Sequence, residues 1–356
     1  MNEDLYILKE EALTLLKELI SLPSFSKEEW QTASAISKYM AERGLATSRV
    51  GNNVFAVNKH FKEVNPTILL ISHHDTVKPN SSYLKDPFAP IIEGDKLYGL
   101  GSNDAGGALV ALLAVFIYYY NKAGLKYNLA FAAVAEEEIS GAGGIESIFS
   151  YLPALHSAIV GEPTEMQLAV AERGLVVFDG VATGKAGHAA RSEGENAIYK
   201  AIKDIEQLLK IQFSRISPLL GSCTLSVTVI ETENKAHNII PDVCRFVVDV
   251  RVNELYTLEE VTQIIQSSIG STIQPRSLLL RSTVIEETHP LVMAGKRLGR
   301  SIYGSPTISD KALLPFPTLK MGPGDSSRSH TADEFIYTNE VREGIDLYIQ
   351  LLNQLL

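Results

Sequence analysis

The segment LAFAAVAEEEISG (Leu129–Gly141) joins a continuous apolar run to three consecutive glutamates. A short apolar run of this kind is typical of a strand buried on both faces of a parallel sheet. Because side chains alternate along extended backbone, Glu137 and Glu138 are expected to diverge where the strand ends. We therefore interpret them as a pair with different tasks, one holding a metal ion and the other handling a proton. Most glutamate pairs belong to solvated surfaces, so this interpretation depends on the rest of the chain.

The length and composition of the chain limit its number of domains, its partners and its location. A chain of 356 residues with 45% hydrophobic and 21% charged residues is typical of a soluble enzyme of two domains. A formal net charge of −10 disfavours nucleic-acid and anionic-membrane partners. Two cysteines, Cys223 and Cys244, exclude a disulfide framework and fit a reducing compartment. The acidic N-terminus lacks signal-peptide features, and the apolar run Ala108–Tyr120 is too short to span a bilayer. A cytoplasmic location is expected.

Helical and strand patterns alternate over the first part of the chain. Apolar periodicity predicts helices over Leu5–Ile20 and from about Gly107. Ser26 and Glu29 have the spacing of a capping box that opens another helix. Strands are predicted at 53–57, 67–72, 129–134 and 157–160. The fold class is therefore α/β, with a mixed, mostly parallel sheet and helices on both faces.

The middle of the chain has a different order of elements. Strands are predicted at 174–183, 224–230, 243–252 and 277–283, with a helix at 195–213. Thr257 and Glu260 form a capping box at the start of a second helix. This β-α-β-β-α-β order is ferredoxin-like. We therefore expect residues 167–285 to be an inserted lid or dimerisation domain, and residues 1–166 and 286–356 to form the catalytic domain.

A histidine pair ends the strand at 67–72. With a period of two, His73 and Asp75 share one face while His74 points to the other. A metal-binding histidine commonly gives its second ring nitrogen to a carboxylate, which fixes the tautomer. His73 is therefore a candidate metal ligand, Asp75 its partner and His74 a structural residue. A turn-capping aspartate beside a surface histidine is the alternative interpretation.

The other candidate ligands follow strands or lie in glycine-rich loops. GLGSNDAGG (99–107) is not a dinucleotide loop, because Asp104 stands where the third glycine would be. Asp104 is either a ligand or the N-cap of the next helix. Glu162 is fixed by the proline that follows it, and His330 lies in the loop 322–335. Ligands bind at the carboxyl ends of strands in α/β sheets. Two imidazoles with several carboxylates suit a pair of divalent metals.

At this point the sequence resembles the M20 metallopeptidase and deacylase family. That family includes acetylornithine deacetylase, succinyl-diaminopimelate desuccinylase, glutamate carboxypeptidase and bacterial dipeptidases. The shared motifs occur in order over nearly the whole chain: SHHDTV, GLGSNDAGG, AEEEISG, GEPT, GKAGHAAR, HNIIPD and GPGDSSRSHTADE. Seven ordered motifs are specific for the superfamily and much less so for the substrate. The resemblance implies a di-zinc exopeptidase-like fold.

The resemblance also implies a metal site. One ion would be held by His73, Asp104 and Glu162. The other would be held by Asp104, Glu138 and His330, so that Asp104 bridges the two. Zinc suits these mixed nitrogen and oxygen ligands, and cobalt or manganese could replace it.

Catalytic and substrate-binding residues are carried over in the same way. Glu137 matches the general base, which takes a proton from a water and delivers it to the leaving amine. Asp75 orients His73. His188, in the inserted domain, matches a histidine that reaches the active site of a partner subunit and steadies the oxyanion. Substrate contacts are assigned to Arg251, Asn238, Arg191, Gly322 and Gly324, although Arg191 is equally well interpreted as a surface residue.

Two departures from the family pattern leave the ligands untouched. The family often has Asp-Met-Lys-Gly-Gly where this chain has Asp104-Ala105-Gly106-Gly107, and Asp where it has Glu136. We expect an amide hydrolase that removes an acyl group from N-acetyl- or N-succinyl-ornithine in arginine biosynthesis, and a homodimer formed through the inserted domain. The alternatives are a succinyl-diaminopimelate desuccinylase and a di- or tripeptidase. A catalytically silent metal-binding or regulatory protein is disfavoured, because such a protein needs no general base.

Overall fold

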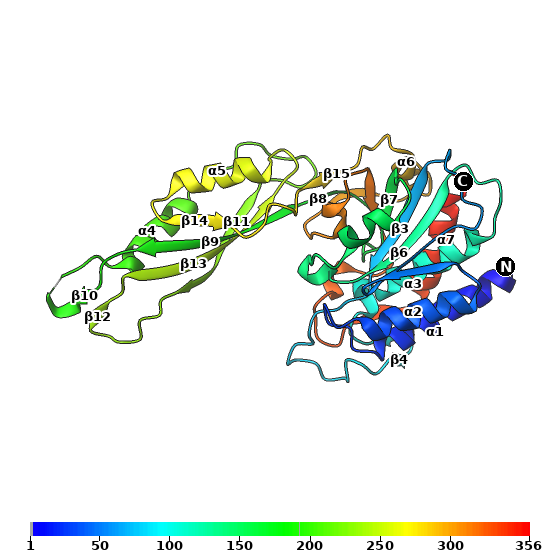
Figure 1. Ribbon diagram of the computed structural model, residues 1–356, viewed down its shortest axis with the longest axis horizontal. Coiled ribbons are helices and arrows are strands. Elements are labelled where there is room, and N and C mark those ends of the chain that lie inside the picture. Colours follow the sequence, from blue (N-terminus) through cyan, green and yellow to red (C-terminus); the bar gives the residue numbers. More distant parts are fainter. Residues whose placement is uncertain (1–2, 192) are drawn as a thin grey trace. The chain divides into compact units, whose positions relative to one another are not determined.

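The computed structural model describes residues 3–191 and 193–356, and the chain divides into two compact units (Figure 1). Unit 1 comprises the chain up to Val170, Ile285–Tyr303 and Ser309–Leu356. Unit 2 comprises Ala171–Val284 and Gly304–Ile308. The roles of catalytic domain and lid that the sequence suggested for 1–166 with 286–356 and for 167–285 stay predictions.

The larger sheet has nine strands, and its centre is parallel. The order is β1-β2-β6-β3-β7-β17-β8-β15, with β16 beside β8. The neighbours β6, β3, β7 and β17 run parallel, whereas the pairs on either side of them are antiparallel. Every residue of β3, β6 and β7 is buried, which explains their continuous apolar sequences. The strands are β1 (Thr47–Val50), β2 (Asn53–Val57), β3 (Thr67–His73), β6 (Asn128–Val134), β7 (Ser157–Val160), β8 (Leu168–Glu172), β15 (Thr283–Val284), β16 (Ile302–Ser305) and β17 (Thr318–Lys320).

Helices cover one face of this sheet. Helix α3 (Gly107–Tyr120) lies against β3 and β6, between α1 (Glu3–Ile20) and α7 (Thr338–Leu352). Nearly all of α3 is buried, so its sequence has no polar face. Among the described residues, one stretch, Ser102–Tyr120, is apolar and long enough to cross a membrane, but 83% of its most apolar window is buried inside the protein. It is therefore the core helix with the turn before it.

The opposite face is packed by short 3-10 helices. Side chains of β3, β6 and β7 form a core there with η3 (Ile145–Tyr151) and with Leu314, which follows η5 (Asp310–Leu313). Two more helices complete unit 1, α2 (Trp30–Glu42) beside β1 and β2, and α6 (Pro290–Arg297) beside α7. A small sheet joins β4 (Ile91–Glu93), β5 (Lys96–Tyr98) and β18 (Phe335–Tyr337).

Unit 2 is ferredoxin-like, as the sequence predicted. Its four-stranded antiparallel sheet has the order β11-β13-β9-β14, and its helices follow β9 and β13 in the chain. Alternate residues of β9 are buried, because one face of the sheet packs against the helices. The elements are β9 (Gly174–Thr183), β10 (Gly187–His188), α4 (Ala197–Leu208), β11 (Thr224–Glu231), β12 (Ile239–Ile240), β13 (Val243–Val252), α5 (Leu258–Ser268) and β14 (Thr272–Pro275).

Two local predictions were wrong and one was confirmed. The last strand of unit 2 is Thr272–Pro275 rather than 277–283, because the chain pairs with β9 directly after α5 ends. The Ser26 capping box does not form, since the Ser26 hydroxyl donates to Asp75 and α2 begins only at Trp30. The capping box at Thr257 forms as predicted.

The chain enters and leaves unit 2 through neighbouring strands. Strand β15 pairs antiparallel with β8, and Val284 lies opposite Ala171. These two residues are the last and the first of the main segment of unit 2. The two ends of the insertion are therefore side by side.

Candidate active site

Three neighbouring parallel strands end where the candidate side chains begin. Strand β3 ends at His73, β6 ends at Val134 shortly before the glutamates, and β7 ends at Val160 shortly before Glu162. Because β6, β3 and β7 are adjacent and parallel, their carboxyl ends meet at one edge of the sheet. This sheet edge is the origin of the site.

Two imidazoles and four carboxylates converge there. The Nε2 atom of His73 lies 3.3 Å from Oδ1 of Asp104 and 3.6 Å from Oε1 of Glu162. The Nε2 atom of His330 lies 3.6 Å from Oδ2 of Asp104 and 3.1 Å from both carboxylate oxygens of Glu138. Asp104 therefore stands between the two imidazoles and directs one oxygen toward each.

Two groups of these side chains could each hold a cation. The first is His73 with Asp104 and Glu138, and the second is His73 with Glu137 and Glu162. In each group the possible ligand atoms lie within 4.8 Å of one another. The second group contains Glu137, which the sequence suggested as a base rather than a ligand. Such a mixture of imidazole and carboxylate donors fits a divalent metal of the zinc, cobalt or manganese type.

Asp75 organises the turn that carries the two glutamates. Its carboxylate accepts hydrogen bonds from the backbone N–H of Glu137 (3.1 Å), the backbone N–H of Glu138 (3.2 Å) and the Ser26 hydroxyl (2.7 Å). Nδ1 of His73 lies 2.9 Å from the backbone carbonyl of Asp75 and 3.5 Å from its carboxylate. Both Asp75 acceptors favour a proton on Nδ1, which leaves Nε2 of His73 facing the other candidate ligands.

The glutamates do not diverge from an extended strand as we expected. Glu137 and Glu138 belong to a 3-10 turn, η2 (Glu137–Ile139), bracketed by Glu136 and Ser140 with φ angles of 57° and 48°. The left-handed backbone at each end, rather than strand alternation, sets their directions. They still face different partners, since Glu137 is directed at His73 (4.0 Å) and Glu138 at His330.

The clustered acids shift one another's pKa values. Burial raises the pKa of Glu137 well above its ordinary value, and the neighbouring carboxylates add to this against the opposing effect of His73. The hydrogen bond that His330 donates to the Glu138 carboxylate raises the pKa of His330 to about 9. Burial acts to lower the pKa of His73, but the surrounding carboxylates outweigh it and raise that pKa well above its usual value. Cations placed among these acids would relieve their repulsion and replace the protons.

His74 has no such role, which agrees with the sequence interpretation. Its Nδ1 atom lies 2.8 Å from the Thr32 hydroxyl and its Nε2 atom 2.9 Å from the backbone carbonyl of Asn52. Burial lowers the pKa of His74 to about 4. The ring is therefore neutral and ties β3 to α2 and to the turn before β2.

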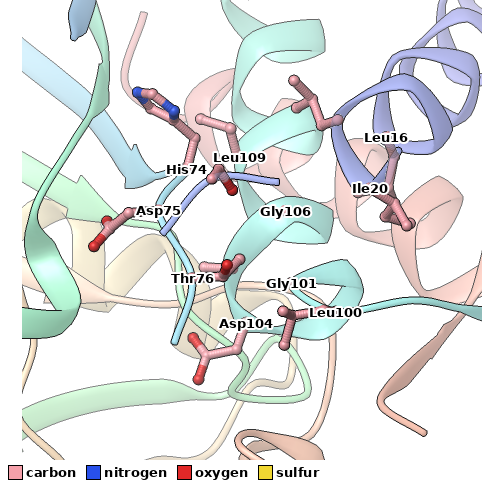
Figure 2. A pocket seen from close by; sticks show the side chains of 13 residues that line it. Leu16, Ile20, His74, Asp75, Thr76, Leu100, Gly101, Asp104, Gly106 and Leu109 are labelled. Carbon is pink, nitrogen blue, oxygen red and sulfur yellow. The ribbon is translucent and has the colours of Figure 1, made fainter. Parts of the chain in front are cut away.

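A small cavity of about 20 Å³ adjoins the Asp104 turn. Figure 2 shows residues that line it, among them Gly101, Gly106, Thr76 and Asp104 together with the apolar side chain of Ile20. A Cβ atom at Gly106 would lie 2.5 Å from the carbonyl oxygen of Gly101. A side chain at Gly106 would therefore collide with the backbone of this turn.

One further acid at the site was missed by sequence reasoning. Glu334, at the end of the His330 loop, is 2% exposed and accepts three backbone hydrogen bonds from the turn that carries Asp104. Burial, followed by repulsion from Asp104, raises its pKa to about 8. The only signal in the sequence was an acid beside an apolar strand, which is too common to single out.

Gly322 and Gly324 hold two candidate segments together. A Cβ atom at Gly322 would lie 2.5 Å from the backbone oxygen of Glu162, and the carbonyl of Gly324 accepts the N–H of Glu165 at 2.7 Å. Gly324 has a φ angle of 96°, which strongly favours glycine. These glycines let the His330 loop approach the Glu162 turn closely. Their place in a substrate pocket stays a prediction.

The predicted residues of unit 2 fall into two places. His188 lies exposed on β10 opposite Ile239 of β12, and the N–H of Ala189 donates to the carbonyl of Asn238. Arg191, also exposed, follows in η4 (Ala189–Arg191). Arg251 is not with them, because it lies at the far end of β13, where its guanidinium pairs with Asp249 at 2.9 Å. The sequence assigned substrate contacts to Arg251, Asn238 and Arg191, and these roles stay predictions.

The comparisons with known proteins agree on one protein family. The model described as Peptidase family M20/M25/M40 matches residues 69–354. A peptidase M20 domain-containing protein of Schizosaccharomyces pombe is 27% identical over 96% of this chain and 84% of its own length. A succinyl-diaminopimelate desuccinylase of Ehrlichia ruminantium is 25% identical over 96% of this chain and 97% of its own. The structure of an M20 family metallo-carboxypeptidase from Sulfolobus solfataricus has a TM-score of 0.77 at 18% identity, with 97% of this chain and 99% of that chain covered.

Proposed function

Because this chain belongs to the peptidase family M20/M25/M40, we propose that it is a metal-dependent amide hydrolase acting on an N-acyl amino acid. The enzyme class follows from the family. The observation that carries the proposal is the convergence of two imidazoles on Asp104, with Glu137, Glu138 and Glu162 around them. A buried acid cluster of this kind is costly unless cations complete it.

We assign the metal ligands as the sequence suggested. His73, Asp104 and Glu162 would hold one ion, and Asp104, Glu138 and His330 the other. Support comes from the distances above, in which each oxygen of Asp104 faces a different imidazole. Two divalent ions supply a water of lowered pKa and an electrophile for the amide carbonyl. Zinc is our first choice, with cobalt or manganese as substitutes.

Glu137 is proposed as the general base. Its carboxylate faces His73 at 4.0 Å, and its backbone is fixed through Asp75, so that it can take a proton from the attacking water and return it to the leaving nitrogen. Burial raises the pKa of Glu137, and cations beside it would lower that pKa again, which favours the ionised form that a general base requires. His188 would donate a hydrogen bond to the oxyanion.

The identity of the acyl group on the substrate is the most specific part of the proposed function. N-Acetylornithine was our first expectation, but the named relatives favour the alternative, an N-succinyl amino acid of the succinyl-diaminopimelate kind. Arg251 is the candidate for gripping a substrate carboxylate, with Asn238 and Arg191 as further contacts. A peptidase activity is the second candidate, favoured by the fold shared with the metallo-carboxypeptidase.

We also propose that the enzyme is a cytoplasmic homodimer formed through unit 2. Strand β11 is an edge of its sheet, and Val229 and Ile230 on it are exposed by 43% and 50%. An unpaired edge with apolar side chains invites pairing with another strand. In such a dimer His188 would act on the site of the partner. Sedimentation of the full chain tests this, since a strictly monomeric enzyme with full activity would contradict it.

Amine release from a substrate panel tests the function. The zinc-loaded protein is incubated with N-succinyl-diaminopimelate, N-acetylornithine, other N-acyl amino acids and dipeptides, beside the same protein kept metal-free by a chelator. We expect metal-dependent turnover, highest on the N-succinyl substrate. Preference for dipeptides would move the protein to the peptidase branch. Absence of turnover on every amide, with two metals bound, would overturn the proposal.

A further inference from the structure

Glu334 reaches the Asp104 turn from a different part of the chain. Strand β18, which follows Glu334, pairs antiparallel with β5, which precedes Gly99, and Phe335 lies opposite Tyr98. The N–H of Gly99 continues this pairing by donating to the backbone carbonyl of Glu334 at 2.9 Å. This pairing places the side chain of Glu334 next to the turn that begins at Gly99.

The Glu334 carboxylate then takes up three backbone donors of that turn. Oε1 accepts from the N–H of Asn103 at 2.8 Å and from the N–H of Asp104 at 2.9 Å. Oε2 accepts from the N–H of Gly101 at 3.0 Å. Asp104 and Ala105 have non-helical backbone angles. The N–H groups of Gly101, Asn103 and Asp104 bond to the carboxylate in place of backbone carbonyls.

We propose that Glu334 is a positioning residue for Asp104, which it holds in the orientation that lets its two oxygens face His73 and His330. The inference rests on the proposed metal site. It adds a residue that the sequence motifs did not identify as a ligand, a catalytic residue or a substrate contact. Through Glu334 the segment that carries His330 also fixes the backbone of Asp104. The two candidate ligands therefore form one interlocked unit.

A second set of contacts supports this coupling. The Asn103 side-chain amide donates to the carbonyl of Asp325 at 3.0 Å, and its oxygen accepts the N–H of Asp325 at 3.1 Å. Asp325 belongs to the same loop as His330 and Glu334. The residue directly before Asp104 is therefore tied to that loop by its side chain as well as by its backbone.

The two oxygens of the Glu334 side chain suit the three donors of the turn. They have enough lone pairs for all three N–H groups, whereas the amide of glutamine has one oxygen and would turn its NH₂ toward an N–H donor. An amide of the same shape therefore cannot satisfy all three donors.

Asp333, the neighbouring residue, provides a matched control. Its Oδ1 accepts the backbone N–H of Leu84 at 2.9 Å and that of Lys85 at 2.8 Å. It thus makes the same kind of bond from the same loop, but to a segment that carries none of the proposed ligands. Carboxylate-to-amide changes at the two positions separate the positioning of Asp104 from general support of the loop.

The test measures metal binding by the full chain rather than catalysis. Metal-free wild type, Glu334→Gln and Asp333→Asn are titrated with zinc and cobalt in competition with a chromophoric chelator. The cobalt absorption spectrum is recorded, and thermal unfolding of each metal-free protein is followed. We expect Glu334→Gln to bind metal about 10- to 100-fold more weakly, as for other residues that orient metal ligands, with an altered cobalt spectrum. Asp333→Asn should bind as wild type.

Two results would overturn the inference. One is wild-type metal affinity and spectrum in Glu334→Gln, and the other is an equal loss in Asp333→Asn. Should Glu334→Gln fail to fold, Glu334→Asp, which keeps the charge but is one methylene shorter, is titrated with the same two readings. Because hydrolysis is not measured, an enzyme that binds two metals but cleaves no amide contradicts the proposed function and leaves this inference standing.

Discussion

Asp104 and His330 stand far apart in the sequence, yet Oδ2 of Asp104 lies 3.6 Å from Nε2 of His330. The whole interpretation of the motifs required this approach. It is achieved by backbone pairing of β5 with β18 and by the contacts of Glu334 and Asn103, which lock the two segments together. The geometry of the proposed metal site consequently depends on the contacts between these two segments.

Replacing Glu137 by glutamine should abolish turnover while two metals stay bound. A general base contributes on the order of 10² to 10⁴ in rate, and Glu137 is not among our proposed ligands. The check is kcat together with metal content, with Glu146→Gln as the control because Glu146 is an exposed acid on η3. Loss of one metal in Glu137→Gln would instead assign it as a ligand, as its grouping with His73 and Glu162 allows.

His188→Ala should lower kcat by about 10² to 10³, the range for loss of one oxyanion donor. Metal affinity should not change, since His188 lies on β10 in unit 2. Tyr199→Ala, which removes an exposed side chain on α4 of the same unit, is the control for general disturbance of unit 2. An unchanged rate in His188→Ala would show that this histidine is a surface residue.

Metal affinity should rise with pH. The pKa of His330 is raised to about 9, so the ring is protonated at neutral pH and a metal must displace the proton. The apparent affinity should therefore increase about tenfold per pH unit for this one proton and level off above about pH 9. Proton release during calorimetric titration, in buffers of different ionisation enthalpy, measures it. His330→Asn should release about one proton fewer, and an equal release would show that His330 is no ligand.

The stability of the metal-free protein should carry a signature of His74. Its pKa is about 4 in the folded protein and ordinarily 6.5, so that the unfolded chain takes up the proton first as pH falls. The contribution of His74 to the free energy of unfolding is thus fully present above pH 6.5, and roughly 3 kcal/mol is lost as the pH falls from 6.5 to 4. Denaturant unfolding of wild type and His74→Gln across this range isolates the effect. Parallel curves for the two proteins would contradict it.

Much of the architecture was predictable because it follows from local patterns. The apolar runs at 67–72, 129–134 and 157–160 are buried on both faces, and the alternation along 174–183 matches a sheet with one covered face. The motifs also named the side chains that meet around Asp104. For these, strand direction and residue type are sufficient information.

What escaped prediction depends on partners distant in the sequence. Ser26 looked like a helix cap, but its hydroxyl donates to the buried carboxylate of Asp75, and α2 begins only at Trp30. Glu334 was not singled out from the sequence, since nothing local indicates that β18 will pair with β5 and bring it next to the Asp104 turn. Each case is tertiary structure overriding a local pattern.

The pairing of Ala171 with Val284 has a practical consequence. Since the first and last residues of the main segment of unit 2 lie opposite each other on antiparallel strands, a tight hairpin turn could connect the two strands directly. Any module whose termini are equally close could be grafted at this point without shifting the register of the large sheet. The junction thus lets the insertion be exchanged for another module while the residues around Asp104, all of which belong to unit 1, keep their places in the chain.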